Sequence, residues 1–284
     1  MDITAETARR LIAEQFPEWS GLPVFPVAKS GHDNRTFHLG ERMTVRLPSA
    51  ACYAAQVEKE GRWLPYLQQR LDYPISRQIA AGRPTGYYPF LWSVNAWIEG
   101  ETLLESRNTE PALAAELAQA LRQLQAADCR GGPAPGLHNF HRGGPLSIYH
   151  RQTLDALESL RGELPAEALR RIWERCLRRP YAGRPVWVHG DVAPGNILLR
   201  EGRFCALIDF GVLGTGDPAC DYAMAWTWFS GQARAAFLEG LPDDLIDRAR
   251  GWALWKAAIT WRDENPDFRE NARFTLRAIC KEQG

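Results

Sequence analysis

The stretch that decides the fold spans residues 186–211 and reads VWVHGDVAPGNILLREGRFCALIDFG. It begins with a short apolar run that predicts a strand, and a polar loop follows. Two further strands are predicted over 197–199 and 204–208, and the turn residues Glu201-Gly202 between them indicate a hairpin. The stretch is therefore a β-rich island in a part of the chain where helical patterns otherwise dominate.

The hairpin determines which polar side chains meet. Because a hairpin brings its two ends together, Asn196 at its start and Asp209 at its end are expected to lie near each other. Asp191 stands five residues before Asn196, close enough to face the same cavity. Carboxylate and amide oxygens suit Mg²⁺, which needs only one or two protein ligands besides substrate phosphates. A further acid that does not bind metal can orient a hydroxyl nucleophile and take its proton. These are the parts that phosphoryl transfer requires.

Three motifs in order carry a family resemblance. They are His-Gly-Asp followed after four residues by Asn, then Ile-Asp-Phe-Gly, then Gly-Asp-Pro-x-x-Asp over 216–221. In this order and spacing the chain resembles the aminoglycoside phosphotransferase family and its small-molecule kinase relatives. The resemblance is strong over 186–221 and moderate over 24–100. It implies an α+β, protein-kinase-like fold with two lobes: a small β-rich nucleotide-binding lobe over 1–98 and a larger helical lobe over 99–284, which holds the catalytic loop, the metal loop and the acceptor site.

The resemblance also implies roles. Asp191 would be the catalytic base or orienter of the acceptor hydroxyl. Asn196 and Asp209 would bind Mg²⁺ that bridges the phosphates of ATP or GTP. The acceptor would be a small molecule with a hydroxyl group.

Three further polar residues near the motifs have structural interpretations. His189 is expected to pin the catalytic loop as a hydrogen-bonded core histidine. Asp217 and Asp221 resemble the acidic pair that follows the family's metal loop, and helix capping and loop bracing are their expected work.

The N-terminal third reads as a small mixed α/β unit. Short apolar runs broken by turn residues predict strands over 24–27, 35–39, 43–47 and 92–97. A helix is expected over 50–70, and Pro65 kinks or splits it.

The cation of the third strand departs from the kinase pattern. That pattern places a lysine where this chain has Arg46, whose planar fork can hold phosphate oxygens bidentately. Glu60 on the following helix is expected to pair with Arg46 and hold it in position, with Glu58 as a rival partner.

Two backbone segments complete the expected nucleotide site. Ser30 and Gly31 lie between the first two strands, where the family's phosphate-covering loop is found, although a single glycine fits a plain surface turn as well. The hinge whose backbone groups read the adenine edge is expected at Ala96, Trp97 and Ile98.

Helices dominate after residue 101. Beyond a long loop over 129–146, helical spacing predicts further helices. They lie over 147–161, 165–178, 220–230, 233–239, 243–258 and 267–281.

The last helices are expected to build the acceptor site, where the resemblance is faint. A polycationic acceptor needs acidic side chains. Asp263 and Glu264 are the first candidates, followed by Asp267 and Glu270. For each of them, a solvated helix face is the competing interpretation.

Composition excludes several classes of protein. Lys plus Arg and Asp plus Glu are both 34, so the formal net charge of zero argues against a dedicated nucleic-acid binder. No stretch approaches the ~20 apolar residues of a membrane-spanning helix. Six cysteines without a CxxC pair, together with an acidic N-terminus that lacks an apolar region, favour a cytoplasmic protein with reduced thiols. The oligomeric state is not visible in the sequence.

Three alternatives stay open at this point. A metabolic small-molecule kinase acting on choline, homoserine or sugar-like acceptors would share all these motifs. A catalytically silent nucleotide-binding protein of the same fold draws its only support from Arg46. A protein kinase is disfavoured because the short segment from Gly211 to Ala219 leaves little room for a peptide-docking surface.

Overall fold

The structure, a computed structural model, describes residues 3–28, 31 and 33–282. The chain divides into two compact units. The first consists of Met1–Gly100 and Ala206–Val212, and the second of Glu101–Cys205 and Leu213–Gly284. Where the sequence predicted domains over 1–98 and 99–284, the contacts place the short segment 206–212 in the first unit.

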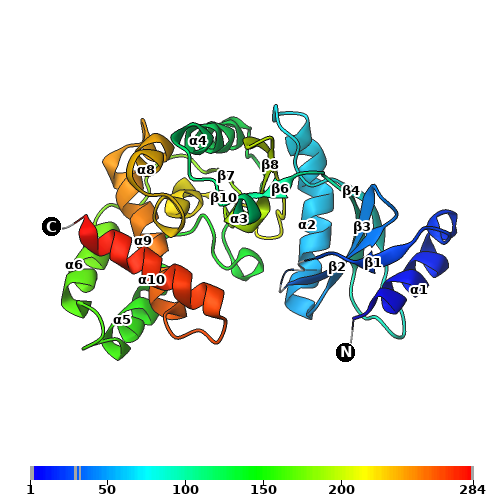
Figure 1. Ribbon diagram of the computed structural model, residues 1–284, viewed down its shortest axis with the longest axis horizontal. Helices are drawn as coiled ribbons and strands as arrows, with labels where there is room; N and C mark the ends of the chain where they lie inside the picture. Colours follow the sequence, from blue (N-terminus) through cyan, green and yellow to red (C-terminus); the bar gives the residue numbers. More distant parts are fainter. Residues whose placement is uncertain (1–2, 29–30, 32, 283–284) are drawn as a thin grey trace. The chain divides into compact units, whose positions relative to one another are not determined.

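An antiparallel sheet in the order β1-β2-β3-β5-β4 forms the centre of the first unit (Figure 1). Its strands are β1 (Val24–Pro26), β2 (Asn34–Leu39), β3 (Met43–Pro48), β4 (Gln78–Gly82) and β5 (Trp92–Ala96). The four predicted strands are confirmed. Gly40 turns the chain between β2 and β3 with φ of 62°, a conformation that suits glycine.

Two α-helices and a 3₁₀ turn accompany this sheet. They are α1 (Ala5–Gln15), η1 (Pro17–Trp19) and α2 (Ala51–Gln68). Pro65 was predicted to kink or split α2. The helix is not split, because it continues past Pro65 to Gln68. Pro65 lies near the end of α2, where it removes only the bond to the Gly61 carbonyl.

The core of the first unit lies between the sheet and α1. Leu39, Val45, Leu47 and Val94 belong to this core, and most of the other residues of β3 and β5 are buried as well, as expected for central strands that are covered on both faces. The other fully buried side chains of this cluster include Leu11, Ile12, Tyr88 and Trp92.

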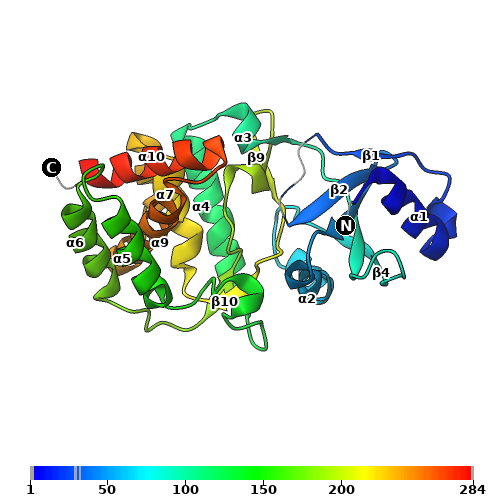
Figure 2. The same ribbon diagram turned by 90° about the horizontal axis from the view of Figure 1, so that it is seen from below.

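The second unit is a helical assembly around α9 (Asp243–Thr260), which contacts α5, α6, α7 and α10 (Figure 2). Apolar residues occur all round α9, which is typical of a buried helix. The other α-helices are α3 (Leu103–Ser106), α4 (Pro111–Ala126), α5 (His150–Ser159), α6 (Ala166–Leu177), α7 (Met224–Thr227), α8 (Gly231–Leu238) and α10 (Pro266–Lys281). The 3₁₀ turns are η2 (Leu137–Asn139), η3 (Leu146–Tyr149), η4 (Pro194–Asn196) and η5 (Pro218–Ala223).

Short strands position the motif stretch. β7 (Val186–Val188) pairs with β10 (Gly214–Gly216), and a second sheet has the order β6-β8-β9. The members of that sheet are β6 (Glu101–Thr102), β8 (Ile197–Arg200) and β9 (Arg203–Leu207). The predicted hairpin is confirmed, and Glu201 and Gly202 turn it with φ values of 52° and 75°.

One predicted helix is wrong in type. The residues over 220–230 form the 3₁₀ turn η5 and the single-turn helix α7 instead of one α-helix. Asp217 caps η5 by accepting the Ala219 N–H, and Trp228 ends α7 with φ of −140°. Apolar spacing cannot separate a 3₁₀ turn from an α-helix over so short a segment.

All six cysteines are free. Within the described ranges, no helix has both the length and the apolar composition needed to cross a bilayer.

Candidate active site

The loop after β7 is held by a buried carboxylate. Asp221 is fully buried, and its Oδ2 and Oδ1 accept the backbone N–H groups of His189 at 2.8 Å and Gly190 at 2.7 Å. His189 is also fully buried, and its Nδ1 accepts the N–H of Asp191 at 3.2 Å. These contacts confirm the structural interpretations of His189 and Asp221.

Asp191 and Asn196 meet across this loop. The side-chain amide of Asn196 donates to both the backbone oxygen and Oδ2 of Asp191, each at 3.0 Å. Because both hydrogen bonds use the amide nitrogen, Oδ1 is the atom of the Asn196 side chain that suits a metal ligand. Asp191 itself is exposed, so an acceptor hydroxyl can reach it.

Asp217 braces the adjoining segment. Besides capping η5, it is joined to the buried Arg248 at 2.7 Å, and Arg248 also reaches Asp244 at 2.7 Å. The residue before Asp217 has to be glycine, because a Cβ at Gly216 would lie 2.1 Å from the backbone oxygen of Gly143. The Gly-Asp-Pro-x-x-Asp motif is therefore explained by the support it gives to the catalytic loop.

Asp221→Asn should weaken the catalytic loop. The amide keeps only one acceptor oxygen, so one of the two N–H groups of His189 and Gly190 loses its partner. We expect the free energy of unfolding to fall by about 1.5–3 kcal/mol, measured by urea denaturation. Asp243→Asn, an exposed change in the first turn of α9, is the matched control. Equal stability of the two variants would contradict the bracing role.

In the first unit, Arg46 joins two carboxylates. Its Nη1 lies 3.2 Å from both oxygens of Glu60, and its Nη2 lies 2.7 Å from Oδ1 of Asp209. The Glu60 side chain is only 3% exposed, and Glu58 is exposed. The expected pairing of Arg46 with Glu60 is therefore present. Burial opposes the charge of Arg46, but Glu60 and Asp209 together outweigh it and raise the pKa of the guanidinium.

Backbone contacts explain why Asp209 belongs with the first unit. The N–H of Leu207 donates to the Pro74 oxygen at 3.2 Å, and the N–H of Asp209 donates to Oγ of Ser76 at 3.1 Å. Asp209 has φ of 63°, a left-handed conformation that aspartate tolerates better than most residues. The segment after β9 is thus tied to the loop before β4, which the sequence pattern did not indicate.

The expected adenine hinge follows β5. The backbone N–H groups of Ala96 and Trp97 are already used. They donate to the backbone oxygens of Arg77 and Arg42, respectively, at 2.8 Å each. Of the three predicted hinge residues, Ile98 is therefore the one whose N–H suits a base edge. Trp97 is 40% exposed and meets His38 edge-on, so it is not a core residue.

The expected phosphate-covering loop is described only in part. Gly31 is exposed, and its backbone oxygen accepts from Arg35 Nη1 at 3.0 Å. Ser30 lies outside the described residues.

Lys59, beside Glu60 on α2, gives a pH-dependent prediction. Burial lowers the pKa of Lys59 from 10.5 to about 8, while Glu60 opposes the shift. Below pH 8 Lys59 is charged in both the folded and the unfolded state, and burying this charge lowers the free energy of unfolding. As the pH rises, the folded state loses the proton first. The free energy of unfolding therefore increases between pH 8 and 10.5. Lys59→Met should raise Tm at pH 7 by about 2–4 °C, and this gain should shrink towards pH 10.5.

The measurement is thermal unfolding of wild type and Lys59→Met at several pH values, with the exposed Lys281→Met as control. A gain that is absent at pH 7, or one that does not change with pH, would contradict the burial cost.

The predicted acceptor residues form the turn between α9 and α10. Oδ1 of Asp263 accepts the N–H of Asn265 at 2.9 Å. The backbone oxygens of Asp263 and Glu264 accept from Arg269 Nη1 at 2.6 and 2.8 Å. Asp263 is half-buried and Glu264 is exposed. These contacts build the turn, and a role of either carboxylate towards the acceptor stays a prediction.

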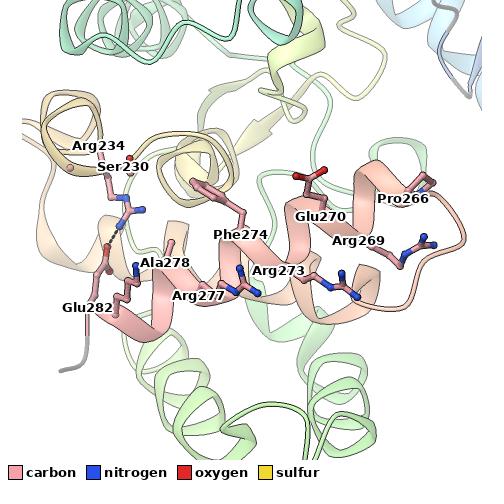
Figure 3. Close-up of a pocket in the computed structure, with 12 residues that line it drawn as sticks. Ser230, Arg234, Pro266, Arg269, Glu270, Arg273, Phe274, Arg277, Ala278 and Glu282 are labelled. Atoms are coloured by element: carbon pink, nitrogen blue, oxygen red, sulfur yellow. Dashed lines mark hydrogen bonds and ion pairs between the residues drawn. The ribbon is translucent and has the colours of Figure 1, made fainter.

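A groove of about 930 Å³ runs along α8 and α10 (Figure 3). The ion pair of Arg234 and Glu282 lies at one end of it. Glu270 is the one predicted acceptor candidate among its described lining residues. Basic side chains of α10 also line it, namely Arg269, Arg273, Arg277 and Lys281.

Sequence reasoning missed two cations near the catalytic loop. Arg142 Nε donates to the backbone oxygen of Gly190 at 2.8 Å, and Lys256 on α9 interacts electrostatically with Asp191. The only available signal was that Lys256 is one of four lysines in the chain. Its position beside the loop depends on how α9 packs, which no local pattern predicts.

The donor set fits a hard divalent cation. Oδ1 of Asn196 and the carboxylate of Asp209 are oxygen ligands of the kind that Mg²⁺ prefers, and one or two of them suffice when phosphates supply the rest. In the described part of the chain, no cluster of three or more His, Cys, Asp or Glu side chains could hold a metal without such help.

Comparisons with solved structures show that the fold is a known one. The structure is similar to wild-type aminoglycoside 2'-phosphotransferase-IIIa in its GDP complex, with 19% identity, a TM-score of 0.73, and coverage of 99% of this chain and 100% of that one. Macrolide 2'-phosphotransferase type I has 20% identity and a TM-score of 0.64, with 98% of each chain covered. Macrolide 2'-phosphotransferase MphH from Brachybacterium faecium has 20% identity and a TM-score of 0.61, with 95% of this chain and 98% of that one covered. These similarities confirm the expected kinase-like fold.

A family model described as "Phosphotransferase enzyme family" matches residues 25–257. The match spans β1 to α9 and includes the catalytic loop, the metal loop and Arg46. This chain therefore belongs to the phosphotransferase enzyme family.

Proposed function

We propose that this protein transfers the γ-phosphoryl group of ATP or GTP to a hydroxyl of a small molecule in a Mg²⁺-dependent reaction. The observation that carries the proposal is the catalytic loop, in which Asp191 and Asn196 are hydrogen-bonded and Asp221 fixes the backbone before them. An exposed carboxylate on a braced loop is suited to orient a hydroxyl and accept its proton.

Each unit supplies part of the machinery. We propose that Arg46, held by Glu60, binds nucleotide phosphate oxygens, and that Asp209 and Asn196 hold Mg²⁺. When bound, the ion would offset the charge that develops on the transferred phosphoryl group. Convergence of these residues on one triphosphate is part of the proposal.

Arg46 also bears on the silent-protein alternative. The only support for that alternative was the replacement of lysine by arginine at this position. In the structure Arg46 reaches both the helix acid Glu60 and the metal-loop acid Asp209. This arrangement supports an active enzyme, because Arg46 is held beside the acid proposed to bind Mg²⁺.

The acceptor can be an antibiotic or a metabolite. Similar structures include a complex of an APH(2'')-IIIa enzyme with kanamycin and macrolide 2'-phosphotransferases, so aminoglycosides and macrolides are candidate acceptors, and antibiotic resistance is a candidate role. Amino alcohols and sugars represent the metabolic alternative. The six free cysteines support the expected cytoplasmic location.

The test is a coupled assay of ATP and GTP turnover against aminoglycosides, macrolides, amino alcohols, sugars and hydroxy acids. We expect acceptor-dependent turnover that EDTA abolishes and Mg²⁺ restores. Mg²⁺-dependent nucleotide binding without transfer to any acceptor would favour the silent protein instead.

A further inference from the structure

Arg142 is tied both to the catalytic loop and to an aromatic cluster on α9. Its Nε donates to the Gly190 backbone oxygen at 2.8 Å, directly before Asp191. Its guanidinium lies 5.2 Å and 5.3 Å from the ring centroids of Trp252 and Trp255. The cation is therefore presented beside the residue proposed to receive the acceptor hydroxyl.

Lys256 belongs to the same cluster. It follows Trp255 in the chain and stands one helical turn after Trp252, on the same face of α9. Its ammonium nitrogen lies 5.8 Å from the ring centroid of Phe268. Burial lowers the pKa of Lys256, and the nearby charge of Arg142 lowers it further, whereas Asp191 and Asp263 oppose the shift. The two cations are thus close enough to interact electrostatically.

Neither cation forms an ion pair with a carboxylate in the described part of the chain. The other basic residues of α9 do: Arg248 pairs with Asp217 and Asp244, and Arg250 pairs with Asp247 and Glu282. The indole N–H of Trp252, which is buried, has no hydrogen-bond partner among the described residues. Close cations repel and an unpartnered donor costs free energy, so this cluster is suited to an anion.

The aromatic side chains around the cations are fixed in place. Tyr149 stacks on Trp255 with ring centroids 3.8 Å apart, and its hydroxyl donates to the Phe140 oxygen at 2.6 Å. The indole N–H of Trp255 donates to Gln152 at 2.8 Å. Trp252 and Trp255 are themselves buried, so these fixed rings hold the Arg142 guanidinium in a preorganised position beside the catalytic loop.

We propose that Arg142 and Lys256 bind an anionic group of the acceptor, a carboxylate or a phosphate, while its hydroxyl is presented to Asp191. This inference rests on the proposed function and names its substrate class. Asp191 and Asp263 are the acids near these cations, and Asp191 is already engaged by the Asn196 amide. Polycationic aminoglycosides would place ammonium groups against Arg142 and Lys256, so they should be poor acceptors.

The first test compares matched acceptors: hydroxy acids and sugar phosphates, their neutral parent alcohols and sugars, and amino sugars. We expect kcat/KM to be at least about tenfold higher for one of the anionic classes than for its neutral parents. Lys256→Met should raise KM for the anionic acceptors by about tenfold, and it should lower the ratio of kcat/KM for anionic acceptors to kcat/KM for their neutral parents by the same factor. Lys281→Met, an exposed lysine on α10, is the matched control and should change neither.

Two outcomes of this assay would overturn the inference while leaving the proposed function intact. One is a preference for amino sugars over their anionic counterparts. The other is an equal fall of kcat for anionic and neutral acceptors in Lys256→Met, which would mean that Lys256 acts on the transferred phosphoryl group.

A second measurement does not depend on turnover. Titration with inorganic phosphate in the presence of saturating ATP should change tryptophan fluorescence, because Trp252 and Trp255 lie under the Arg142 guanidinium. The apparent Kd should rise about tenfold in Lys256→Met and stay constant in Lys281→Met. If no acceptor supports turnover, the proposed function fails, but this titration still tests the anion-binding role of Lys256. An apparent Kd for phosphate that is the same in wild type and Lys256→Met would overturn the inference.

Discussion

Asp191→Asn is expected to lower kcat by about 10²–10⁴-fold, the usual contribution of a general base. The amide has the same shape as the carboxylate but cannot accept the proton of the acceptor hydroxyl. Because Asp191 is exposed and its loop is held through Asp221, the fold should be unaffected. The affinity for nucleotide should also stay close to that of wild type, since the proposed phosphate contact is made by Arg46.

Turnover and nucleotide binding have to be measured on the same preparation. Asp155→Asn is the control, because it removes an exposed carboxylate that forms an ion pair with Arg151, at 3.5 Å on the preceding turn of α5. It should leave both quantities unchanged. Turnover of Asp191→Asn within about threefold of wild type would exclude the proton-accepting role and would point to simple positioning of the acceptor.

The chemistry of the site could be predicted because it is local in sequence. Asp191 and Asn196 lie on one loop, and a turn at Glu201-Gly202 requires a hairpin that leads on to Asp209. Arg46 could be predicted in the same way, because its strand and the helix that follows are consecutive elements. The ion pair with Glu60 then follows from the resemblance, and the structure shows it.

What the sequence could not supply depends on packing between distant segments. Arg142 acts on the catalytic loop, but it stands 48 residues before Gly190 in the chain. Lys256 has no motif, and its place beside the loop depends on how α9 packs. The strand β4 was missed because an edge strand of sequence QIAAG has no apolar run, and α1 was missed because its pattern is mostly polar.

Arg46→Met is expected to destabilise the protein by about 3–5 kcal/mol and to weaken nucleotide binding by about 10–100-fold. Arg46 is the cation shared by Glu60 and Asp209, and the Glu60 side chain is only 3% exposed. Without the guanidinium, a buried carboxylate is left without compensation. Arg42→Met, an exposed change in the turn before β3, should alter neither quantity. Urea denaturation and titration calorimetry with ATP and Mg²⁺ measure the two effects.

The double variant Arg46→Met/Glu60→Gln separates support of the fold from binding of the nucleotide. Removing the charge of Glu60 removes the uncompensated buried carboxylate, so most of the lost stability should return. Nucleotide affinity should stay low, because the neutral pair offers no cation to the phosphates. If affinity returned together with stability, Arg46 would serve the fold alone, and the arginine in place of the usual lysine would have no part in holding the phosphates. If stability did not return, the charge of Glu60 would not be the cause of the defect, and the contact of Arg46 with Asp209 would have to account for it.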